Sequence, residues 1–185
     1  MFCESKYIDS IPWMRANAPL DYDALTCLRF CGNMVNRLKY EKNLSVCKMI
    51  DTIGVNMLFG YQRTYRIIAV APRDVYVYGF VDILLDGRYI LVLFTDVDDD
   101  KPEEKGCVRM EAFGGMVFTP NKDDPSKCRM DVLQTIDIKM NLIPSYIVSQ
   151  VVNLSAHGIC TIQDLMPKWV KENKQWLEEN PLIEQ

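Results

Sequence analysis

The spacing of apolar residues predicts a helical region near the start of the chain. Residues 21–32 carry apolar side chains at helical spacing, after an acidic first turn that suits the exposed N–H groups of a helix start. The Gly-Asn pair at 32–33 ends this helix, and a second short helix runs to about Tyr40. Before them we expect one strand that ends near Trp13, followed by a break at residues 17–21.

From Leu44 onward the pattern becomes that of β-strands. Asp86-Gly87 separates two β-branched and aromatic runs, which is a strong hairpin signal. Paired glycines at 114–115 predict a bulge or a sharp bend inside a strand. The last strand alternates apolar and polar residues, so one of its faces should meet solvent. The predicted strands span residues 46–50, 55–65, 75–84, 89–94, 108–118 and 128–139.

The last quarter of the chain predicts a long amphipathic helix. Asn141 suits its N-cap and Pro144 its first turn, whereas Pro167 should start, kink or interrupt its last part. The residues that share its apolar face are Ile143, Ile147, Val151, Leu154 and Gly158.

This order of elements predicts a single α+β domain over residues 1–185. About six consecutive antiparallel strands form a curved sheet, and the long helix must bury its apolar face in the concavity of that sheet. Such a fold either packs solid or encloses a cavity, and the pattern alone leaves both open.

Composition and charge then exclude several classes of protein. The chain is 49% hydrophobic and 25% charged, which is typical of a globular protein and excludes a disordered one. The formal net charge of -4 argues against nucleic acid as a partner and against a general electrostatic grip on phosphate. Without a membrane-length apolar run or a signal-peptide shape at the N-terminus, we expect a cytoplasmic protein.

The candidate chemistry is sparse. The seven cysteines form no CxxC pair and the chain has one histidine, so we expect mostly buried free thiols, no metal site and no cofactor. The acidic run at 96–100 fails as a calcium loop, because Lys101 replaces the turn glycine and Cys107 the last glutamate. His157 has Ser155 and Cys160 too near in sequence to imply a catalytic triad, so we expect no catalytic residue.

Three sequence segments, taken in order, resemble the START domain family, the lipid-transfer module related to the steroidogenic acute regulatory protein. PRD at 72–74 opens a strand, EEKG at 103–106 leads into VRMEAFGG at 108–115, and QTIDIKMNLIPSYIVSQVV occupies 134–152. The resemblance extends from about residue 38 to about residue 165.

The chain also departs from the family pattern. Asn141 stands where the family often has a small residue, and Leu38 where a tryptophan is common. The N-terminus looks short, as if the family's first helix and opening strands were absent.

The resemblance implies a helix-grip fold, with a curved sheet wrapped around the C-terminal helix to enclose a lipid tunnel. Such a protein binds one lipid and transfers it between membranes, with transient membrane contact and no covalent chemistry. By analogy, residues 65–71 and the C-terminal helix would form the gate. The tunnel would be lined by Gln62, Val75, Val77, Gly79, Val81, Ile147, Val151 and Leu154.

The resemblance also bears on the choice of lipid. Some sterol-binding members bury an acid and an arginine at positions that map near Gln62 and Gly79, and neither residue is charged here. A phospholipid or another acyl lipid is therefore favoured over a sterol. Arg73, Asp74 and Arg109 are interpreted as structural. A lipid-sensing adaptor and an enzyme on the same fold stay open as alternatives.

Overall fold

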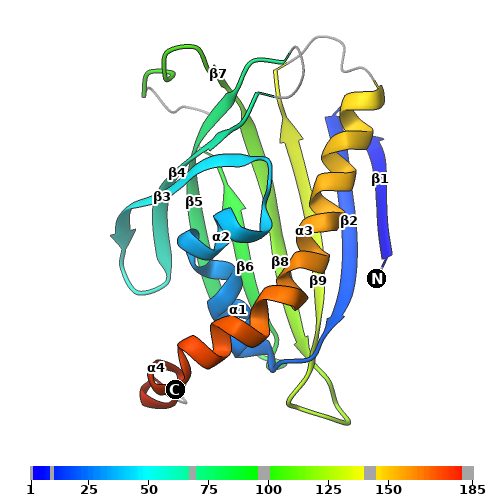
Figure 1. Cartoon of the computed structure of the whole chain (residues 1–185), viewed down its shortest axis with the longest axis vertical. Helices are drawn as coiled ribbons and strands as arrows, with labels where there is room; N and C mark the ends of the chain where they lie inside the picture. Colours follow the sequence, from blue (N-terminus) through cyan, green and yellow to red (C-terminus); the bar gives the residue numbers. More distant parts are fainter. Residues whose placement is uncertain (1, 9–10, 67–69, 96–100, 140–144, 181–185) are drawn as a thin grey trace.

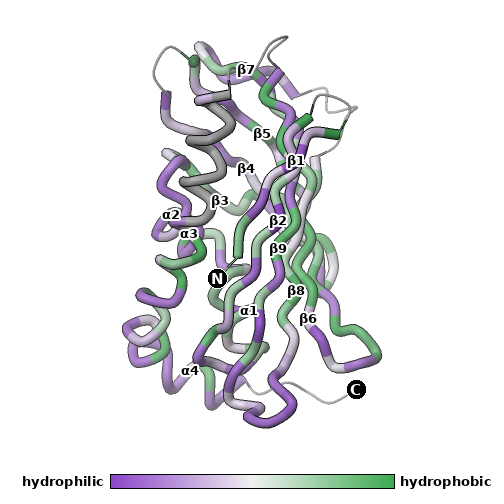
Figure 2. The backbone as a smooth tube through the Cα atoms, turned by 90° about the vertical axis from the view of Figure 1, so that its right-hand side faces the viewer, coloured by the Kyte–Doolittle hydropathy of each residue, from purple (hydrophilic) through white to green (hydrophobic). Residues whose placement is uncertain are grey.

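A computed structural model describes residues 2–8, 11–66, 70–95, 101–139 and 145–180, without the side chains of residues 145 and 147–156. One curved sheet and four helices make up this part of the chain, and the helices lie on one side of the sheet (Figures 1 and 2). In these residues, no helix is both long and apolar enough to span a membrane.

The sheet is antiparallel apart from one short strand. Its order is β1-β2-β9-β8-β6-β5-β4-β3, and β7 pairs with β5 in parallel. The β7 strand was not expected, because its two residues are too few to show a period. The strands are β1 (Phe2–Ile8), β2 (Ile11–Leu20), β3 (Leu44–Ile53), β4 (Met57–Thr64), β5 (Arg73–Ile83), β6 (Tyr89–Phe94), β7 (Val108–Arg109), β8 (Glu111–Pro120) and β9 (Cys128–Asp137).

Two short helices precede β3, and two follow β9. Asp23 caps α1 by accepting a hydrogen bond from the backbone N–H of Thr26 at 2.9 Å, and Asn33 separates α1 from α2. The long α3 crosses the concave face of the sheet, as the amphipathic pattern predicted (Figure 1). The helices are α1 (Ala24–Gly32), α2 (Met34–Tyr40), α3 (Ser145–Glu172) and α4 (Lys174–Glu179).

Alternation of side chains along the strands explains why one face of the sheet is exposed to solvent and the other is buried against the helices. In β9, Met130 and Val132 are buried against the helices, whereas Arg129 is exposed on the convex face. In β2, Met14 and Ala16 are buried while Arg15 is exposed. The half-solvated character predicted for β9 is confirmed, and it extends to β2.

The interior is packed solid where α1 and the last part of α3 meet the sheet. Phe30 is completely buried between Tyr40, at a ring-centroid distance of 6.0 Å, and Trp169, at 5.4 Å with an edge-to-face geometry. Phe118 and Met130, both fully buried, belong to the same apolar cluster. We call this region the packed half of the interior.

The N-terminal prediction was wrong in two respects. Residues 2–20 form a hairpin of two strands, β1 and β2, where one strand and then a break were expected. The β2 strand continues through Pro19 to Leu20, because it pairs with β9 over its length from Trp13. This long-range ladder overrides the local signal of the Asn-Ala-Pro segment. Two strands therefore precede α1, where the sequence predicted one.

The prediction for the glycine pair at 114–115 was also incomplete. The register of β8 is continuous with both β6 and β9, so the strand contains no bulge. A Cβ atom at Gly115 would lie 2.7 Å from the carbonyl oxygen of Leu91. Glycine is needed here because the strands approach one another too closely for a side chain.

The proline in the C-terminal helix neither starts nor interrupts it, because α3 continues through Pro167 to Glu172. The predicted helix start at Asn141, Ile143 and Pro144 lies outside the described residues, as does the acidic run at 96–100.

Candidate functional site

A cavity of about 90 Å³ lies between the concave face of the sheet and the helices α2 and α3. Apolar side chains supply most of its wall: Met14, Leu44, Leu91, Leu93, Met110, Ala112, Met116, Val132, Ile136, Ile159 and Ile162. This volume holds several water molecules, but it is smaller than the roughly 300–1,000 Å³ of pockets for drug-sized ligands. A lipid would therefore have to displace part of the wall.

One end of this cavity is polar, and we call it the polar end: Arg37 and Glu41 from α2 and its C-cap, and Gln62 from β4. The Nη2 atom of Arg37 lies 2.7 Å from the Glu41 carboxylate, and the two side chains are only 12% and 22% exposed. Burial opposes the charged form of Arg37, but the facing Glu41 holds the pKa of Arg37 above its ordinary value.

Arg37 and Glu41 were not predicted from the sequence, because α2 is oriented against its own hydrophobic pattern. Val35 is 67% exposed and Leu38 is 37% exposed, while Arg37 faces inward with Met34 one turn before it. Asn33 caps α2 by accepting from the N–H of Val35 at 2.9 Å. An Arg and a Glu spaced i,i+4 were the only available signal, and that spacing is usually a solvent-exposed ion pair.

The residues predicted on the strands all face inward, but they do not all reach this cavity. Gln62 lines it and is 4% exposed. Val75 and Val77 pack with Met34 in a neighbouring apolar cluster. Val81 packs against the main core, beyond the cavity wall.

Gly79 shares that inner face of β5, with Leu58 and Leu93 crowding the space that a side chain would need. A Cβ atom there would lie 2.9 Å from the Leu58 side chain and 3.2 Å from that of Leu93. Nearby apolar side chains thus occupy the space that a larger ligand would take.

The helix residues predicted to line the tunnel lie in the first part of α3. Ile147, Val151 and Leu154 belong to this helix, but their side chains lie outside the described part of the structure. One turn further on, Gly158 lines the cavity, and a Cβ atom there would lie 3.1 Å from the carbonyl oxygen of Tyr40. A glycine therefore lets α3 approach the end of α2 and close the cavity.

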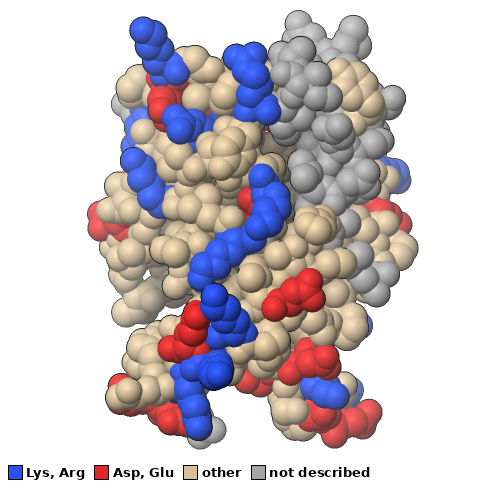
Figure 3. All heavy atoms as spheres, viewed as in Figure 1, with Lys and Arg blue, Asp and Glu red and all other residues tan. Residues whose placement is uncertain are grey.

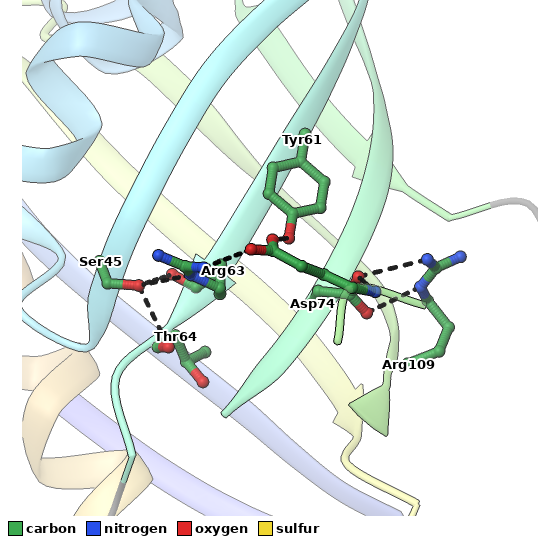
Figure 4. A network of polar contacts seen from close by, with 7 residues as sticks. Ser45, Tyr61, Arg63, Thr64, Asp74 and Arg109 are labelled. Carbon is green, nitrogen blue, oxygen red and sulfur yellow. Dashed lines mark hydrogen bonds and ion pairs between the residues drawn. The ribbon is translucent and has the colours of Figure 1, made fainter. Parts of the chain in front are cut away.

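On the convex face, a polar network ties residues 101–109 to the sheet (Figure 4). Asp74 is fully buried and lies 3.0 Å from the guanidinium of Arg109, and it accepts from the backbone N–H of Glu104. The Glu104 carboxylate in turn accepts from Tyr61 and lies 2.6 Å from Arg63. Burial and this hydrogen bond raise the pKa of Tyr61. Asp74 and Arg109 thus contact other residues of the protein and are not among the described residues of the cavity wall.

Arg73 links Ala71, the last residue of the predicted gate segment 65–71, to the chain that follows β9. Its Nη1 donates to the carbonyl of Ala71 at 2.6 Å, and its Nε donates to the carbonyl of Ile138 at 3.1 Å. Residues 67–69 of the predicted gate lie outside the described residues. Arg73 is the first residue of β5, so these contacts tie the start of that strand to the chain that follows β9, and Arg73 is not among the described residues of the cavity wall.

Among the residues that the structure describes, groups for covalent or metal chemistry do not gather at this cavity. His157 is exposed on α3, although the next two residues of the helix line the cavity. Over the described residues, no three His, Cys, Asp or Glu side chains are placed to hold a metal ion. None of the seven cysteines, all of which lie in the described part of the chain, forms a disulfide bond, and Cys27, Cys31, Cys47 and Cys128 are buried.

A second hollow, of about 430 Å³, lies on the convex face over β6, β8 and β9. Val117 and the half-exposed Phe113 and Leu133 contribute its apolar surface, and Arg129 at its rim is paired with Asp131 at 2.7 Å. On the opposite side, over the helices, basic and acidic side chains are interspersed (Figure 3).

Comparison with known proteins gives one family and several solved structures. The family model described as START domain matches residues 23–175. Human STARD10 superposes with a TM-score of 0.79 at 17% identity, covering 96% of this chain and 74% of that chain. Human StAR-related lipid transfer protein 5 gives 0.75 at 16% identity, covering 85% and 76%.

The lipid transfer and protein localization domain of human StarD13 gives a TM-score of 0.72 at 17% identity, covering 88% of this chain and 82% of that chain. No curated protein sequence matches. At these identities the solved structures establish a shared fold, and the family model establishes the family.

Proposed function

The chain belongs to the START domain family, and on that premise we propose that it binds a single lipid between the sheet and α3 and carries it between membranes. The lipid makes and breaks no covalent bond in this process. The protein would act in the cytoplasm and touch membranes transiently, and residues 1–185 would form one lipid-binding domain.

The observation that carries this proposal is the cavity itself. It is walled mainly by apolar side chains and has a few polar groups at one end, which is the composition of a small-molecule site. An acyl chain or a sterol that leaves a bilayer exposes apolar surface at about 0.8 kcal/mol per CH₂, and an apolar cavity removes that cost.

The residues that we propose to contact the lipid fall into three groups. Gln62 lies at the polar end, Val75, Val77, Gly79 and Val81 lie on the inner face of β5, and Ile147, Val151 and Leu154 lie on α3. Because the closed cavity is small, the lipid must open a larger space by moving α3 and its side chains away from the inner face of β5. The predicted gate at residues 65–71 would move with α3.

The test is extraction of lipid from vesicles by the purified protein, with native mass spectrometry of the complex. Ala112 on β8 lines the cavity, whereas Val117 on the same strand lies in the hollow on the opposite face. We expect Ala112→Phe to fill the cavity and reduce extraction at least tenfold. Val117→Phe serves as the matched control and should extract as the unmodified protein does.

Two outcomes would overturn the proposal. The first is an unmodified protein that takes no lipid from vesicles of mixed composition. The second is equal extraction by Ala112→Phe and the unmodified protein, with both folded by circular dichroism, because the lipid would then lie elsewhere.

The convex hollow supports one alternative, in which the bound lipid regulates a contact with another protein. Phe113 is 51% exposed there and Leu133 is 47% exposed, which is apolar surface of the kind that such a contact uses. A regulatory domain of this kind would retain its lipid and transfer little of it to acceptor vesicles. A carrier releases it, so the ratio of extraction to delivery distinguishes the two.

A further inference from the structure

The sheet is open, and its two outermost strands differ in how regular they are. β1 and β3 stand at opposite ends of the strand order, and among the described strands neither has a neighbour on its outer side (Figure 1). The register of β3 with β4 shifts at two places, and such irregularities oppose pairing with a further strand. β1 pairs with β2 without a shift over all seven of its residues. The outer edge of β1 is therefore a regular edge that another strand can join.

The side chains of β1 are mostly exposed, and several of them are apolar. Phe2 is 46% exposed, Tyr7 is 48% exposed and Ile8 is 47% exposed. Apart from the half-buried Cys3, every residue of the strand is exposed. A strand that combines exposed apolar side chains with unpaired backbone N–H and C=O groups is a template for pairing with another chain. β1 thus has the features of an interaction edge.

The sequence of β1 is complementary to itself. FCESKYI has two apolar residues, an acid, a serine, a base and two apolar residues, so its chemistry is symmetric about Ser5. When two copies pair antiparallel with serine opposite serine, Glu4 of each copy faces Lys6 of the other, and Phe2 faces Ile8. Opposite charges directly across an antiparallel pair attract each other. A lysine on an edge strand usually opposes pairing, but in this register each lysine meets a glutamate.

The pairing of β1 with β2 shows on which face these charges lie. Cys3 pairs with the buried Ala16 and points to the concave face of the sheet. Glu4 pairs with the exposed Arg15, so Glu4 and Lys6 point to the convex face. A shift of two residues in either direction would put the two glutamates or the two lysines opposite each other, and like charges there repel. A shift of one residue would turn the concave faces of the two sheets to opposite sides. The symmetric register is therefore the one that the side chains favour.

We propose that the outer edge of β1 is a dimerisation edge, and that its partner is β1 of a second copy of this chain. The two strands run antiparallel about a two-fold axis at Ser5 and join the two sheets into one. Both concave faces, and the cavities against them, then lie on the same side of the joined sheet. Two Glu4–Lys6 ion pairs flank the axis, and Phe2 and Ile8 cover each other at the two ends.

The first test measures the oligomeric state by sedimentation velocity over a series of protein concentrations. We expect the unmodified protein to form a dimer that dissociates on dilution. Lys6→Glu places two glutamates opposite each other on both sides of the axis and should raise the dissociation constant about tenfold or more. Lys48→Glu makes the same change of charge on the exposed side of β3, at the other edge of the sheet. This matched control should dimerise as the unmodified protein does.

An exchange of charges separates strand pairing from a general effect of net charge. Glu4→Lys/Lys6→Glu again places an acid opposite a base, at unchanged net charge, and should recover the dimer. The single variants Glu4→Lys and Lys6→Glu should each be weakened in self-association. Mixed together they should form a heterodimer, because one strand then has two lysines and the other has two glutamates. Circular dichroism verifies that each variant is folded.

A disulfide bond tests the register. Residues directly opposite each other in an antiparallel pair have Cα atoms about 4.5–5.5 Å apart, within the range of a disulfide. Ser5→Cys should therefore form an intermolecular disulfide under mild oxidation, in a Cys160→Ser background that removes the exposed thiol. The background protein alone should not, because its two Cys3 residues are offset by about 13 Å along the strands.

Three outcomes would overturn this inference, and none of them depends on lipid binding. The first is a protein that stays monomeric at every concentration. The second is a dimer that Lys6→Glu leaves unchanged or that Lys48→Glu weakens equally, because the contact would then lie elsewhere. The third is a dimer in which Ser5→Cys forms no intermolecular disulfide, because the strands would then pair in another register or not at all.

Discussion

The two halves of the interior are built from the same sheet but differ in how they are filled. In the packed half, Phe30 packs against Tyr40 and, edge-to-face, against Trp169, and Phe118 is fully buried in the same apolar cluster. In the other half, which we call the hollow half, the same strands face a cavity with Arg37 and the other polar-end residues at one end. One part of the interior is thus filled by side chains, which stabilise the fold, and the other part contains a cavity.

The comparison teaches that burial alone does not identify a structural residue. Tyr40 is buried and donates its hydroxyl proton to the carbonyl of Cys31 at 3.0 Å, so its polar group is satisfied. Gln62 is equally buried, and its Nε2 has no partner among the described groups. Among the described side chains, the two buried nitrogen atoms without a hydrogen-bond partner, one on Arg37 and one on Gln62, both belong to residues of the cavity wall.

The largest effect should come from breaking the packed half. Phe30→Ala removes a fully buried ring and should lower the free energy of unfolding by about 3–5 kcal/mol. This corresponds to a fall of roughly 6–20 °C in melting temperature. Lipid extraction per folded molecule should not change. Leu38→Ala, on the exposed side of α2, is the control and should cost less than about 1 kcal/mol. Equal losses from both variants would show that the packing described here does not hold in solution.

A smaller effect should come from breaking the ion pair of the hollow half. Arg37→Met leaves the Glu41 carboxylate without its partner and should cost about 1–3 kcal/mol in thermal or chemical unfolding. Adding Glu41→Met should recover most of that loss, because removing both charges is often neutral. If the double variant is as unstable as the sum of the single variants, the two charges are not coupled and the pair is not formed.

The smallest effect concerns how easily each half opens, and buried thiols report it. Burial raises the pKa of Cys47, in the hollow half, to about 11, and it also raises the pKa of Cys31 in the packed half. With vesicles present at pH 8, we expect a thiol reagent to label exposed Cys160 first, then Cys47, and Cys31 last, as followed by mass spectrometry. Each 1.4 kcal/mol of difference in opening free energy gives about a tenfold difference in rate.

The pH of that measurement follows from the sign of the shift. The folded-state pKa of Cys47 exceeds its ordinary value of 9.0, so the stability linked to its protonated form is present below pH 9 and is lost as the pH rises toward about 11. At pH 8 labelling therefore reports opening of the native state. Faster labelling of Cys31 than of Cys47 would reverse the assignment of the two halves.

Most of the sheet and the long helix could be predicted from the sequence. The strands between Leu44 and Asp137 bury alternate residues, and α3 has apolar residues at helical spacing. The buried face of each element can therefore be predicted from its own sequence. The motifs around residues 72–74, 103–115 and 134–152 also sufficed to indicate the family, which the match over residues 23–175 establishes.

The polar end of the cavity could be predicted only in part. Gln62 was identified through its resemblance to a family position, and the structure places it on the cavity wall. Arg37 and Glu41 were not identified, because a charged pair on a short helix usually lies on the solvent-exposed face of that helix. Val35 and Leu38 would have been expected to face inward in their place.

The sequence by itself therefore determined the helices and, apart from β7, the strands that follow Leu44, because those choices depend on residues within a few positions of one another. Tertiary structure alone decided that residues 2–20 form a hairpin against β9, and that α2 turns its charged side toward Gln62. Both outcomes depend on partners more than twenty residues away. The cavity arises in the same way, since no single element contains it.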